Sequence, residues 1–335
     1  MAERIQTRFT EQLGIEVPLI CGAMYPCTNP ELVAAVSDAG GIGVIQPMSF
    51  EFVHRVPLEE GLRRIRQLTD RPIGFNAIVE TSVKAYFDRM RRWIDIALEH
   101  GVRFFVTALG KPDWVVEQAH AAGAVVYHDV TNRTHALRAR DAGVDGLICV
   151  NRLAGGHAGK LDPQELHEQL ADLGLPLVCA GGIGDEHDFV RALQMGYDAA
   201  QLGTRFIATD ECQVSPAYKE AIVRARADDV VLTDKLSGVP CAVIRTPELD
   251  RAGYRAGPIA RWLLRGRRTK HLMRAVYQIR SLWSLRRAAT GAASYRNVWQ
   301  AGKSVERIER VEPAAAVVER FARAAREALG AARAP

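Results

Sequence analysis

The sequence reads AGGHAG at residues 154–159, CAGGIG at 179–184 and QLGTRF at 201–206. Each of these glycine-rich turns follows an apolar run of strand length, and a helical pattern at 186–195 separates the second turn from the third. This spacing suits a right-handed crossover between parallel strands. Glycine between a strand and a helix lets backbone N–H groups approach an anion closely. We therefore predict that the second and third turns form a phosphate cup and that the first turn carries a reactive group.

Apolar runs alternate with helical patterns throughout residues 18–202. We predict eight strands, at residues 18–22, 42–45, 72–78, 103–107, 124–128, 146–150, 176–180 and 198–202. Glycines that commonly end helices stand shortly before six of them, at Gly40, Gly101, Gly123, Gly143, Gly174 and Gly196. Eight strand–helix units predict an α/β fold of the closed (β/α)₈ TIM barrel type rather than an open doubly wound sheet.

A dinucleotide-binding Rossmann fold is the main competing interpretation. Its G-x-G-x-x-G fingerprint should follow the first strand and open a helix. The candidates at 41–43 and 182–184 both lack the third glycine. In a TIM barrel the phosphate site lies instead in the loops after strands seven and eight, which here carry Gly181, Gly182, Gly203 and Thr204. The barrel is therefore the favoured fold.

The pattern changes after the eighth predicted strand. Residues 216–227 have a helical pattern, 230–246 are extended or mixed, and 261–285 form one or two strongly basic helices. An amphipathic helix at 313–329 is expected to close the barrel. We therefore predict a barrel at 1–214, a helical basic cap at 215–295 inserted after strand eight, and a C-terminal segment at 296–335 that returns to the barrel.

The composition is that of a soluble globular protein with a sizeable core. Of the 335 residues, 48% are hydrophobic and 25% are charged. The chain has no apolar run of about 18 residues that would span a membrane, and its N-terminus lacks the apolar core of a signal peptide. The six cysteines form no C-x-x-C pair, and Cys149 and Cys179 end apolar strands. We therefore expect buried free thiols and a cytoplasmic location.

Positive charge is concentrated in one segment. Residues 251–305 contain thirteen Lys or Arg and no Asp or Glu, so the rest of the chain is net acidic although the whole carries +5. The segment could be a solvated cap neutralised by the barrel, a docking face for an acidic partner, or a surface that contacts a membrane. We expect no nucleic-acid partner, because no recognised binding module accompanies the charge.

A phosphate cup of this kind suggests FMN rather than a dinucleotide, with a sugar-phosphate substrate as the alternative. Asn76, at the end of strand three, has an amide that could bind the edge of an isoalloxazine ring or simply satisfy a turn. Gly22, Ala23 and Met24, at the end of strand one, offer small side chains and a bare backbone. This arrangement suits a flat ring, although a plain turn explains it equally well.

His157 is the main candidate acid or base. Histidine exchanges a proton near neutral pH, and the neighbouring glycines leave space for a substrate. A structural hydrogen-bonding role is the alternative. The sequence has no H-E-x-x-H motif, cysteine cluster or EF-hand spacing, so we predict no metal site.

Taken together, these motifs resemble those of a known enzyme family. The glycine-rich turn at 154–159, AGG at 180–182 and LGTRFIATDE at 202–211 are similar to the nitronate monooxygenase family, formerly called 2-nitropropane dioxygenases. ELVAAVSDAGGIG at 31–43 and WQAGKS at 299–304 also resemble it. The resemblance spans nearly the whole chain.

The resemblance implies an FMN-binding TIM barrel with a helical cap. It implies that alkyl nitronates are oxidised with O₂ to a carbonyl compound and nitrite, and that His157 faces the substrate. Four of the expected FMN-binding residues hold the phosphate: Gly181, Gly182, Gly203 and Thr204. The other expected FMN-binding residues are Gly22, Ala23, Met24, Asn76, Gly155, Gly156 and Ala180.

The same superfamily includes enoyl-acyl-carrier-protein reductases and NAD(P)H:quinone reductases with similar glycine turns. The alternative function is therefore NAD(P)H-dependent reduction of a quinone or an enoyl thioester, with NAD(P)H or an acidic carrier protein at residues 251–305. A flavin-binding regulatory protein without enzymatic activity is a third interpretation.

One departure from the family pattern bears on the mechanism. Relatives often place a Lys near the flavin after strand five, where this chain reads His128-Asp129-Val130. A cation that would favour anionic reduced flavin is then missing from that position, unless another basic residue replaces it.

Overall fold

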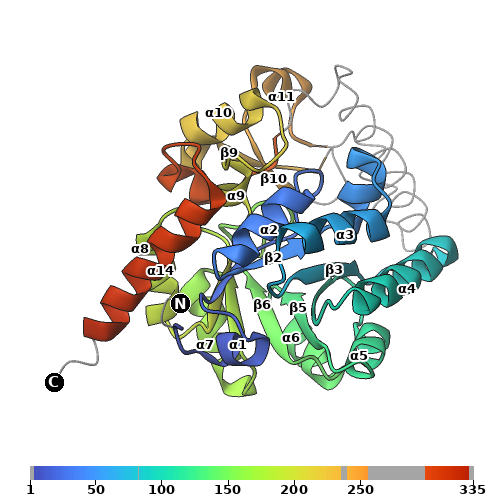
Figure 1. Ribbon diagram of the computed structural model, residues 1–335. Helices are drawn as coiled ribbons and strands as arrows, with labels where there is room; N and C mark the ends of the chain where they lie inside the picture. Colours follow the sequence, from blue (N-terminus) through green and yellow to red (C-terminus); the bar gives the residue numbers. More distant parts are fainter. Residues whose placement is uncertain (1–3, 82, 235–239, 256–298, 332–335) are drawn as a thin grey trace.

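The computed structural model describes residues 4–81, 83–234, 240–255 and 299–331 (Figure 1). The basic helices predicted at 261–285, and with them most of the predicted cap, lie outside the described residues. Within the described ranges, no helix is both long enough and apolar enough to cross a membrane.

Eight parallel strands close into a barrel, and each pairs with the next in chain order until β8 pairs with β1. The strands are β1 (Leu19–Cys21), β2 (Ile42–Ile45), β3 (Gly74–Ile78), β4 (Phe104–Ala108), β5 (Val125–Val130), β6 (Gly146–Val150), β7 (Leu177–Ala180) and β8 (Ala199–Leu202). The predicted (β/α)₈ barrel is confirmed, and each strand begins and ends within two residues of its predicted bounds.

Helices surround the barrel on its outside (Figure 1). They are α2 (Pro30–Asp38), α3 (Leu58–Leu68), α4 (Lys84–Glu99), α5 (Asp113–His120), α6 (Arg133–Asp141), α7 (Pro163–Leu170) and α8 (Glu186–Gln194). The amphipathic helix predicted near the C-terminus is α14 (Ala314–Ala331), which packs against both α8 and α2. It therefore completes the ring in the place of the helix that would follow strand eight.

Alternate residues of each strand face the two sides of the barrel wall. On β5, Val125 and Tyr127 pack in the barrel interior, whereas Val126 and Val130 pack in the layer between the strands and the helices. This alternation places Asp129 on the interior side, next to the open end of the barrel.

The opposite end of the barrel is filled by aromatic rings. Phe9, on the short helix α1 (Arg8–Leu13), lies edge-on to Phe104 and Tyr127, with ring centroids 5.8 and 5.6 Å away. Such edge-to-face contacts are favourable beyond the area that they bury. These rings pack the amino-terminal end of the barrel, and the cavity described below opens at the carboxyl end of the strands.

Glycines end the helices as predicted. Gly40, Gly101, Gly123, Gly143, Gly174 and Gly196 all have positive φ, which a residue with a Cβ rarely adopts. Asn29 occupies the N-cap position of α2, but its side chain does not make the capping hydrogen bond. Its amide donates to Glu31 and to the carbonyl of Glu211 instead, which joins the start of α2 to the segment after β8.

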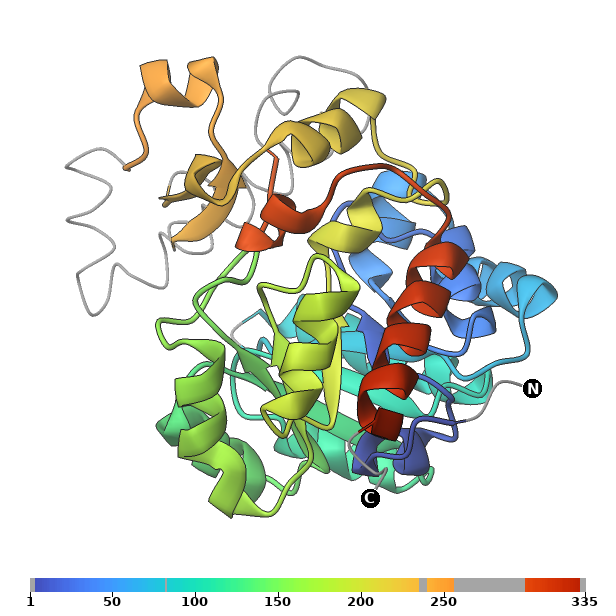
Figure 2. The same ribbon diagram turned by 90° about the vertical axis from the view of Figure 1, so that its left-hand side faces the viewer.

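The chain after β8 builds a layer over the open end of the barrel (Figure 2). Its elements are α9 (Thr204–Ile207), α10 (Pro216–Arg224), a 3₁₀ turn (Ala227–Asp229), the antiparallel pair β9 (Val230–Thr233) and β10 (Cys241–Ile244), α11 (Pro247–Ala252) and a 3₁₀ helix (Lys303–Arg307). The N–H of Ala242 on β10 donates to the carbonyl of Gly156 at 2.8 Å, so this layer contacts the first glycine-rich turn directly.

Candidate active site

One large cavity opens at the carboxyl end of the strands, where the active sites of TIM-barrel enzymes lie. Its volume is about 990 Å³, enough for a cofactor and a small substrate. All the residues that the sequence singled out line it: Gly22, Ala23, Met24, Asn76, Gly155, Gly156, His157, Ala180, Gly181, Gly182, Gly203 and Thr204. The three turns and the ends of β1 and β3 therefore surround one space.

Asn151, directly after β6, joins the first turn to the second. The residue is fully buried, and its Oδ1 accepts a hydrogen bond from the N–H of Leu153 at 2.8 Å. Its Nδ2 donates to the carbonyl of Gly181 at 3.0 Å, and its own N–H donates to the carbonyl of Ala180. One amide side chain thus fixes the position of both turns.

Two glycines in these turns are required by close backbone packing. Gly181 has φ +117°, and a Cβ there would lie 2.5 Å from the backbone nitrogen of Ala154 and 2.6 Å from Oδ1 of Asn151. A Cβ on Gly155 would lie 2.9 Å from the backbone nitrogen of Gly302. Neither position can hold a larger residue unless the backbone moves.

Several N–H groups in the second and third turns have no protein acceptor. Within the described part of the chain, the N–H groups of Gly182, Ile183 and Thr204 take part in no hydrogen bond, although Ile183 and Thr204 are buried. Buried backbone donors are nearly always paired, so these three indicate a missing acceptor. The Oγ1 of Thr204 is already used, since it accepts from the N–H of Gly302 at 2.9 Å.

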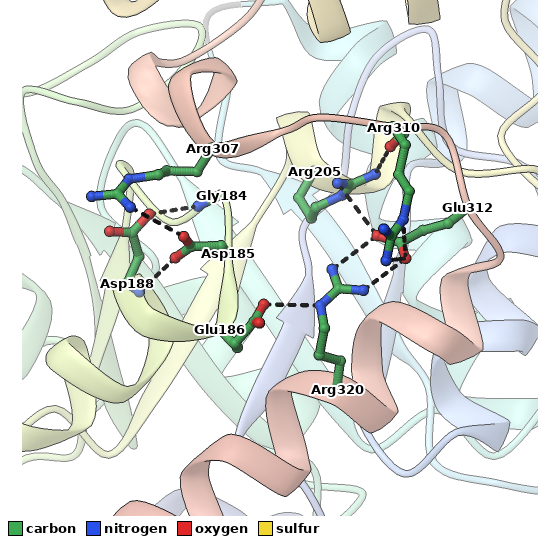
Figure 3. Close-up of polar contacts among 9 residues, drawn as sticks. All are labelled: Gly184, Asp185, Glu186, Asp188, Arg205, Arg307, Arg310, Glu312 and Arg320. Carbon is green, nitrogen blue, oxygen red and sulfur yellow. Dashed lines mark hydrogen bonds and ion pairs between the residues drawn. The ribbon is translucent and has the colours of Figure 1, made fainter.

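A network of ion pairs lies behind the third turn (Figure 3). Arg205 is only 2% exposed; it forms an ion pair with Glu312 at 3.5 Å and donates to the carbonyls of Ala208 and Arg310. Burial lowers the pKa of Arg205 to about 10, so it remains a cation at neutral pH. Glu312 also binds Arg320 through two hydrogen bonds of 2.7 and 2.8 Å, which ties α14 to the turn.

A second group of ion pairs stands behind the second turn (Figure 3). Asp185 caps α8 by accepting from the N–H of Asp188 at 2.8 Å, and it contacts Arg307 at 3.4 Å. The N–H of Gly184 donates to the carboxylate of Asp188. The start of α8 is therefore already satisfied by protein groups, which leaves the anion-binding capacity in the turns themselves.

The other end of the cavity is formed by β1, β3 and β8. Asn76 is 7% exposed and lies at an interior position of β3. Gly22 faces the side chain of Gln201, and a Cβ at position 22 would lie 3.0 Å from it. The chain thus leaves a smooth, uncharged surface with two amide side chains, a surface on which a flat polar ring could lie.

His157 stands at the mouth of the cavity, on the first turn. Its side chain is exposed to solvent, and the protein atoms around it nevertheless lower its pKa. The imidazole is therefore mostly neutral at pH 7 and has a nitrogen lone pair that can accept a proton.

The two polar residues at the end of β5 point in opposite directions. His128 is on the helix side, where its Nδ1 lies 2.8 Å from Oγ1 of Thr107, and burial lowers its pKa to about 4. Asp129 is on the interior side, and its buried Oδ1 has no hydrogen-bond partner among the described residues. Burial raises the pKa of Asp129 to about 7.

The cavity has cations only toward its rim, as far as the described residues show. Lys111, in the loop after β4, and Arg138, on α6, both line the cavity. Lys111 is held by Asp113 at 2.9 Å, and the side chain of Arg138 is exposed. Neither side chain forms an ion pair with Asp129, so no described residue takes the place of the lysine that the family resemblance leads us to expect near the flavin.

Cys27 also lines the cavity. Its hydrogen bond with Cys212, together with burial, raises the pKa of its thiol well above the ordinary value. A thiol in this state is a poor nucleophile. All six cysteines are free and buried, as predicted for Cys149 and Cys179.

Sequence reasoning missed two of the residues that organise this site. Asn151 follows β6 directly and Gln201 lies within β8, and each looks like an ordinary polar residue in the sequence. Their position in the sequence could have identified them, because polar side chains at the carboxyl ends of barrel strands generally face the active site.

Comparison with known proteins identifies the family. The family model described as nitronate monooxygenase matches residues 6–323. A probable nitronate monooxygenase from Staphylococcus saprophyticus is 30% identical over 280 residues, which cover 71% of this chain and 78% of the relative.

The chain is also similar to proteins that are not named nitronate monooxygenases, among them a curated dehydrogenase and a solved structure. A (3aS,4S,5R,7aS)-5-hydroxy-7a-methyl-1-oxo-octahydro-1H-indene-4-carboxyl-CoA dehydrogenase from Mycobacterium tuberculosis is 29% identical over 260 residues, or 76% of this chain and 70% of the relative. The structure of FabK from Thermotoga maritima has a TM-score of 0.79 at 28% identity, and the match covers 98% of this chain and 99% of FabK.

Proposed function

The chain belongs to the nitronate monooxygenase family and is an oxidoreductase, and we propose that it uses FMN to oxidise alkyl nitronates with O₂ to a carbonyl compound and nitrite. The family match and the S. saprophyticus relative support the reaction. The layout of the cavity supports the cofactor.

The observation that carries the proposal is that the N–H groups of Gly182, Ile183 and Thr204 have no acceptor among the described residues. These three residues belong to the turns after the neighbouring strands β7 and β8, and all three line the same cavity. A phosphate has the acceptor oxygens that such donors lack. The residues therefore fit the terminal phosphate of FMN, with Asn76 and the Gly22–Met24 strand end placed to receive its ring.

FMN, when bound, would supply the redox chemistry by taking electrons from the substrate and passing them to O₂. His157 acts on the substrate side. Its neutral imidazole can accept the α-proton of a neutral nitroalkane, or donate a hydrogen bond to a nitronate oxygen through its other nitrogen. The surrounding glycines leave room for the substrate next to this side chain.

A second candidate is an oxidoreductase of acyl thioesters that exchanges electrons with NAD(P)H. The M. tuberculosis relative, whose name specifies a carboxyl-CoA substrate, favours it. So do Lys111 and Arg138, which put positive charge at the rim where an anionic carrier group would pass. The predicted docking segment at 251–305 lies largely outside the described residues.

The visible absorption spectrum of the purified protein tests the cofactor. We expect a yellow protein with bound FMN, and a colourless protein that takes up no added FMN would overturn the proposal. Anaerobic mixing then separates the two candidates. Bleaching by an alkyl nitronate alone supports the monooxygenase, whereas bleaching only by NAD(P)H supports the thioester or quinone oxidoreductase.

A further inference from the structure

Asp129 carries a carboxyl group inside the barrel that has no hydrogen-bond or ion-pair partner among the described residues. It occupies the next-to-last position of β5, on the same side of the strand as Val125 and Tyr127, which pack in the barrel interior. Its side chain lines the cavity, and its Oδ1 is buried with no hydrogen-bond partner among the described residues. A buried oxygen left unpaired in this way indicates that a ligand supplies the partner.

No neighbouring charge in the described residues neutralises this carboxyl. The other ionisable side chains that line the cavity are Lys111, His128, His135, Arg138, Asp141 and His157. Lys111 is paired with Asp113, and His128 faces the helix side with Thr107. Cys149, on β6, is the one further group whose pKa responds to Asp129, and its thiol is neutral because burial raises that pKa.

Burial without a cation favours the neutral form of a carboxyl. The pKa of Asp129 is raised to about 7 by burial alone. Near neutral pH the group is therefore substantially a carboxylic acid, which can donate a hydrogen bond as well as accept one. Its place in the barrel and the absence of a described partner thus point to a hydrogen-bond donor that faces the ligand.

We propose that Asp129, in its protonated form, donates a hydrogen bond to the ring of the bound flavin. This inference rests on the proposed function, since it requires FMN in the cavity. It assigns to Asp129 the role of a positioning and tuning residue for the cofactor.

The depth of Asp129 favours the flavin over the substrate as its partner. Asp129, Asn76 and Ala180 all lie within their strands, at the floor of the cavity, whereas His157 lies on a loop at its mouth. The phosphate cup begins directly after Ala180. Asp129 and the turns of this cup line the same cavity, so a ring held by the cup would lie within the space that Asp129 faces.

Ionisation of Asp129 should weaken flavin binding. The carboxylate cannot donate the hydrogen bond, and its negative charge opposes the added electron density of reduced flavin. A lysine at this position would stabilise reduced flavin through its positive charge, whereas the ionised carboxylate destabilises it. FMN affinity should therefore fall as the pH rises through neutrality, and reduced FMN should be affected more than oxidised FMN.

The test is to titrate FMN into the apo-protein at pH 5.5 and 8.5 and to follow flavin fluorescence for the wild type, Asp129→Asn and Asp141→Asn. Asp141 is an exposed carboxyl at the rim of the same cavity and serves as the matched control. The phosphate of FMN titrates in every sample, so the comparison between variants isolates Asp129. We expect the wild type and Asp141→Asn to lose about tenfold more affinity over this range than Asp129→Asn does.

Equilibration of each holoprotein with a redox dye of known potential provides a second measurement. At pH 8.5, Asp129→Asn should hold a larger fraction of reduced FMN than the wild type, and Asp129→Lys a larger fraction still. If Asp129→Asn does not yield folded protein, infrared spectra of the wild type should show a protonated carboxyl band that shifts when FMN binds.

The outcomes separate the two proposals. If the wild type binds FMN but Asp129→Asn follows it in both affinity and reduction at each pH, the role of Asp129 is wrong and the proposed function stands. If the infrared spectrum shows no carboxyl band that responds to FMN, the role of Asp129 is likewise wrong and the proposed function stands. If the wild type binds no FMN, both proposals fail.

Discussion

The two ends of the cavity differ in how their polar groups are satisfied. At the ends of β7 and β8, the charged side chains are paired with one another, and Arg205, Glu312 and Arg320 connect the third turn to α14 (Figure 3). Among the described residues, the donors left without an acceptor at this end are backbone N–H groups in the turns and the buried Nε of Arg205. At the end of β5, a whole carboxyl group, Asp129, is left without a described partner.

The site therefore has one part that the protein itself holds in place and another part that a ligand would complete. The phosphate end is held rigid by interactions of the protein with itself, so it offers a preformed cup of fixed donors. At the ring end, where Asn76 and Asp129 line the cavity, the buried Oδ1 of Asp129 has no partner among the described residues, so a ligand would complete this end. Substitutions at the phosphate end should therefore change stability and cofactor binding, and those at the ring end should change the response to pH.

His157 stands apart from both ends, and its substitution should have the largest effect. We expect His157→Asn to retain yellow FMN and to lose about 10²–10⁴-fold in turnover of a neutral nitroalkane, the contribution typical of a general acid or base. Steady-state rates and the visible spectrum measure the two properties separately. Unchanged turnover would remove His157 from the mechanism, and loss of FMN would assign it to the cofactor side.

The rigidity of the phosphate end can be broken at Glu312. In Glu312→Ala, the guanidinium of Arg205 stays buried without its carboxylate, which typically costs about 3–5 kcal/mol of unfolding free energy. Urea unfolding monitored by circular dichroism measures the loss. Arg310→Ala is the matched control, because the side chain of Arg310 is 68% exposed and its ion pair with Glu312 should contribute less than about 1 kcal/mol. Equal losses in the two variants would contradict the structural role of the buried pair.

The barrel and the backbone part of the site could be predicted from the sequence, because both depend on local patterns. The eight strands appear as apolar runs, since strands buried on both faces need few polar residues. The turns at Gly155 and Gly181 can be found in the sequence because glycine is required where backbones come close.

The side-chain part of the site could not be predicted, because it depends on contacts between distant segments. Arg205 and Glu312 are 107 positions apart in the sequence, and nothing local marks them as partners. The sequence marks Asp129 as a departure from the family pattern. That it has no partner among the described residues follows from the direction of its side chain and from the pairing of Lys111 with Asp113. Asn29 shows the same principle, since its amide binds the segment after β8 instead of capping α2.

The cup itself can be broken at Gly181. Gly181→Ala adds a Cβ at φ +117° that collides with Ala154 and Asn151, and relieving this contact must displace the second turn. Strain of about 1–3 kcal/mol predicts that FMN binds about five- to 150-fold more weakly, as measured by fluorescence titration. Gly174→Ala is the control, because Gly174 also has positive φ but no atom lies within 4 Å of a Cβ there. A similar loss of FMN in both variants would mean that general strain, and not the cup, is responsible.

The smallest effect is expected at the ring end, in the apo-protein. The pKa of Asp129 is raised above its unfolded value, so the native state holds a proton that the unfolded chain releases between about pH 4 and pH 7. This carboxyl therefore destabilises the apo-protein increasingly over that range and by a constant amount above it.

Asp129→Asn removes the effect and should raise the unfolding free energy at pH 8 by about 1–2 kcal/mol, less than the full pKa shift implies because the side chain is half-buried. At pH 4.5 the variant and the wild type should differ little. Urea unfolding at the two pH values measures this, with Asp141→Asn as the exposed control, and a gain that is the same at both would show that Asp129 does not titrate within the cavity.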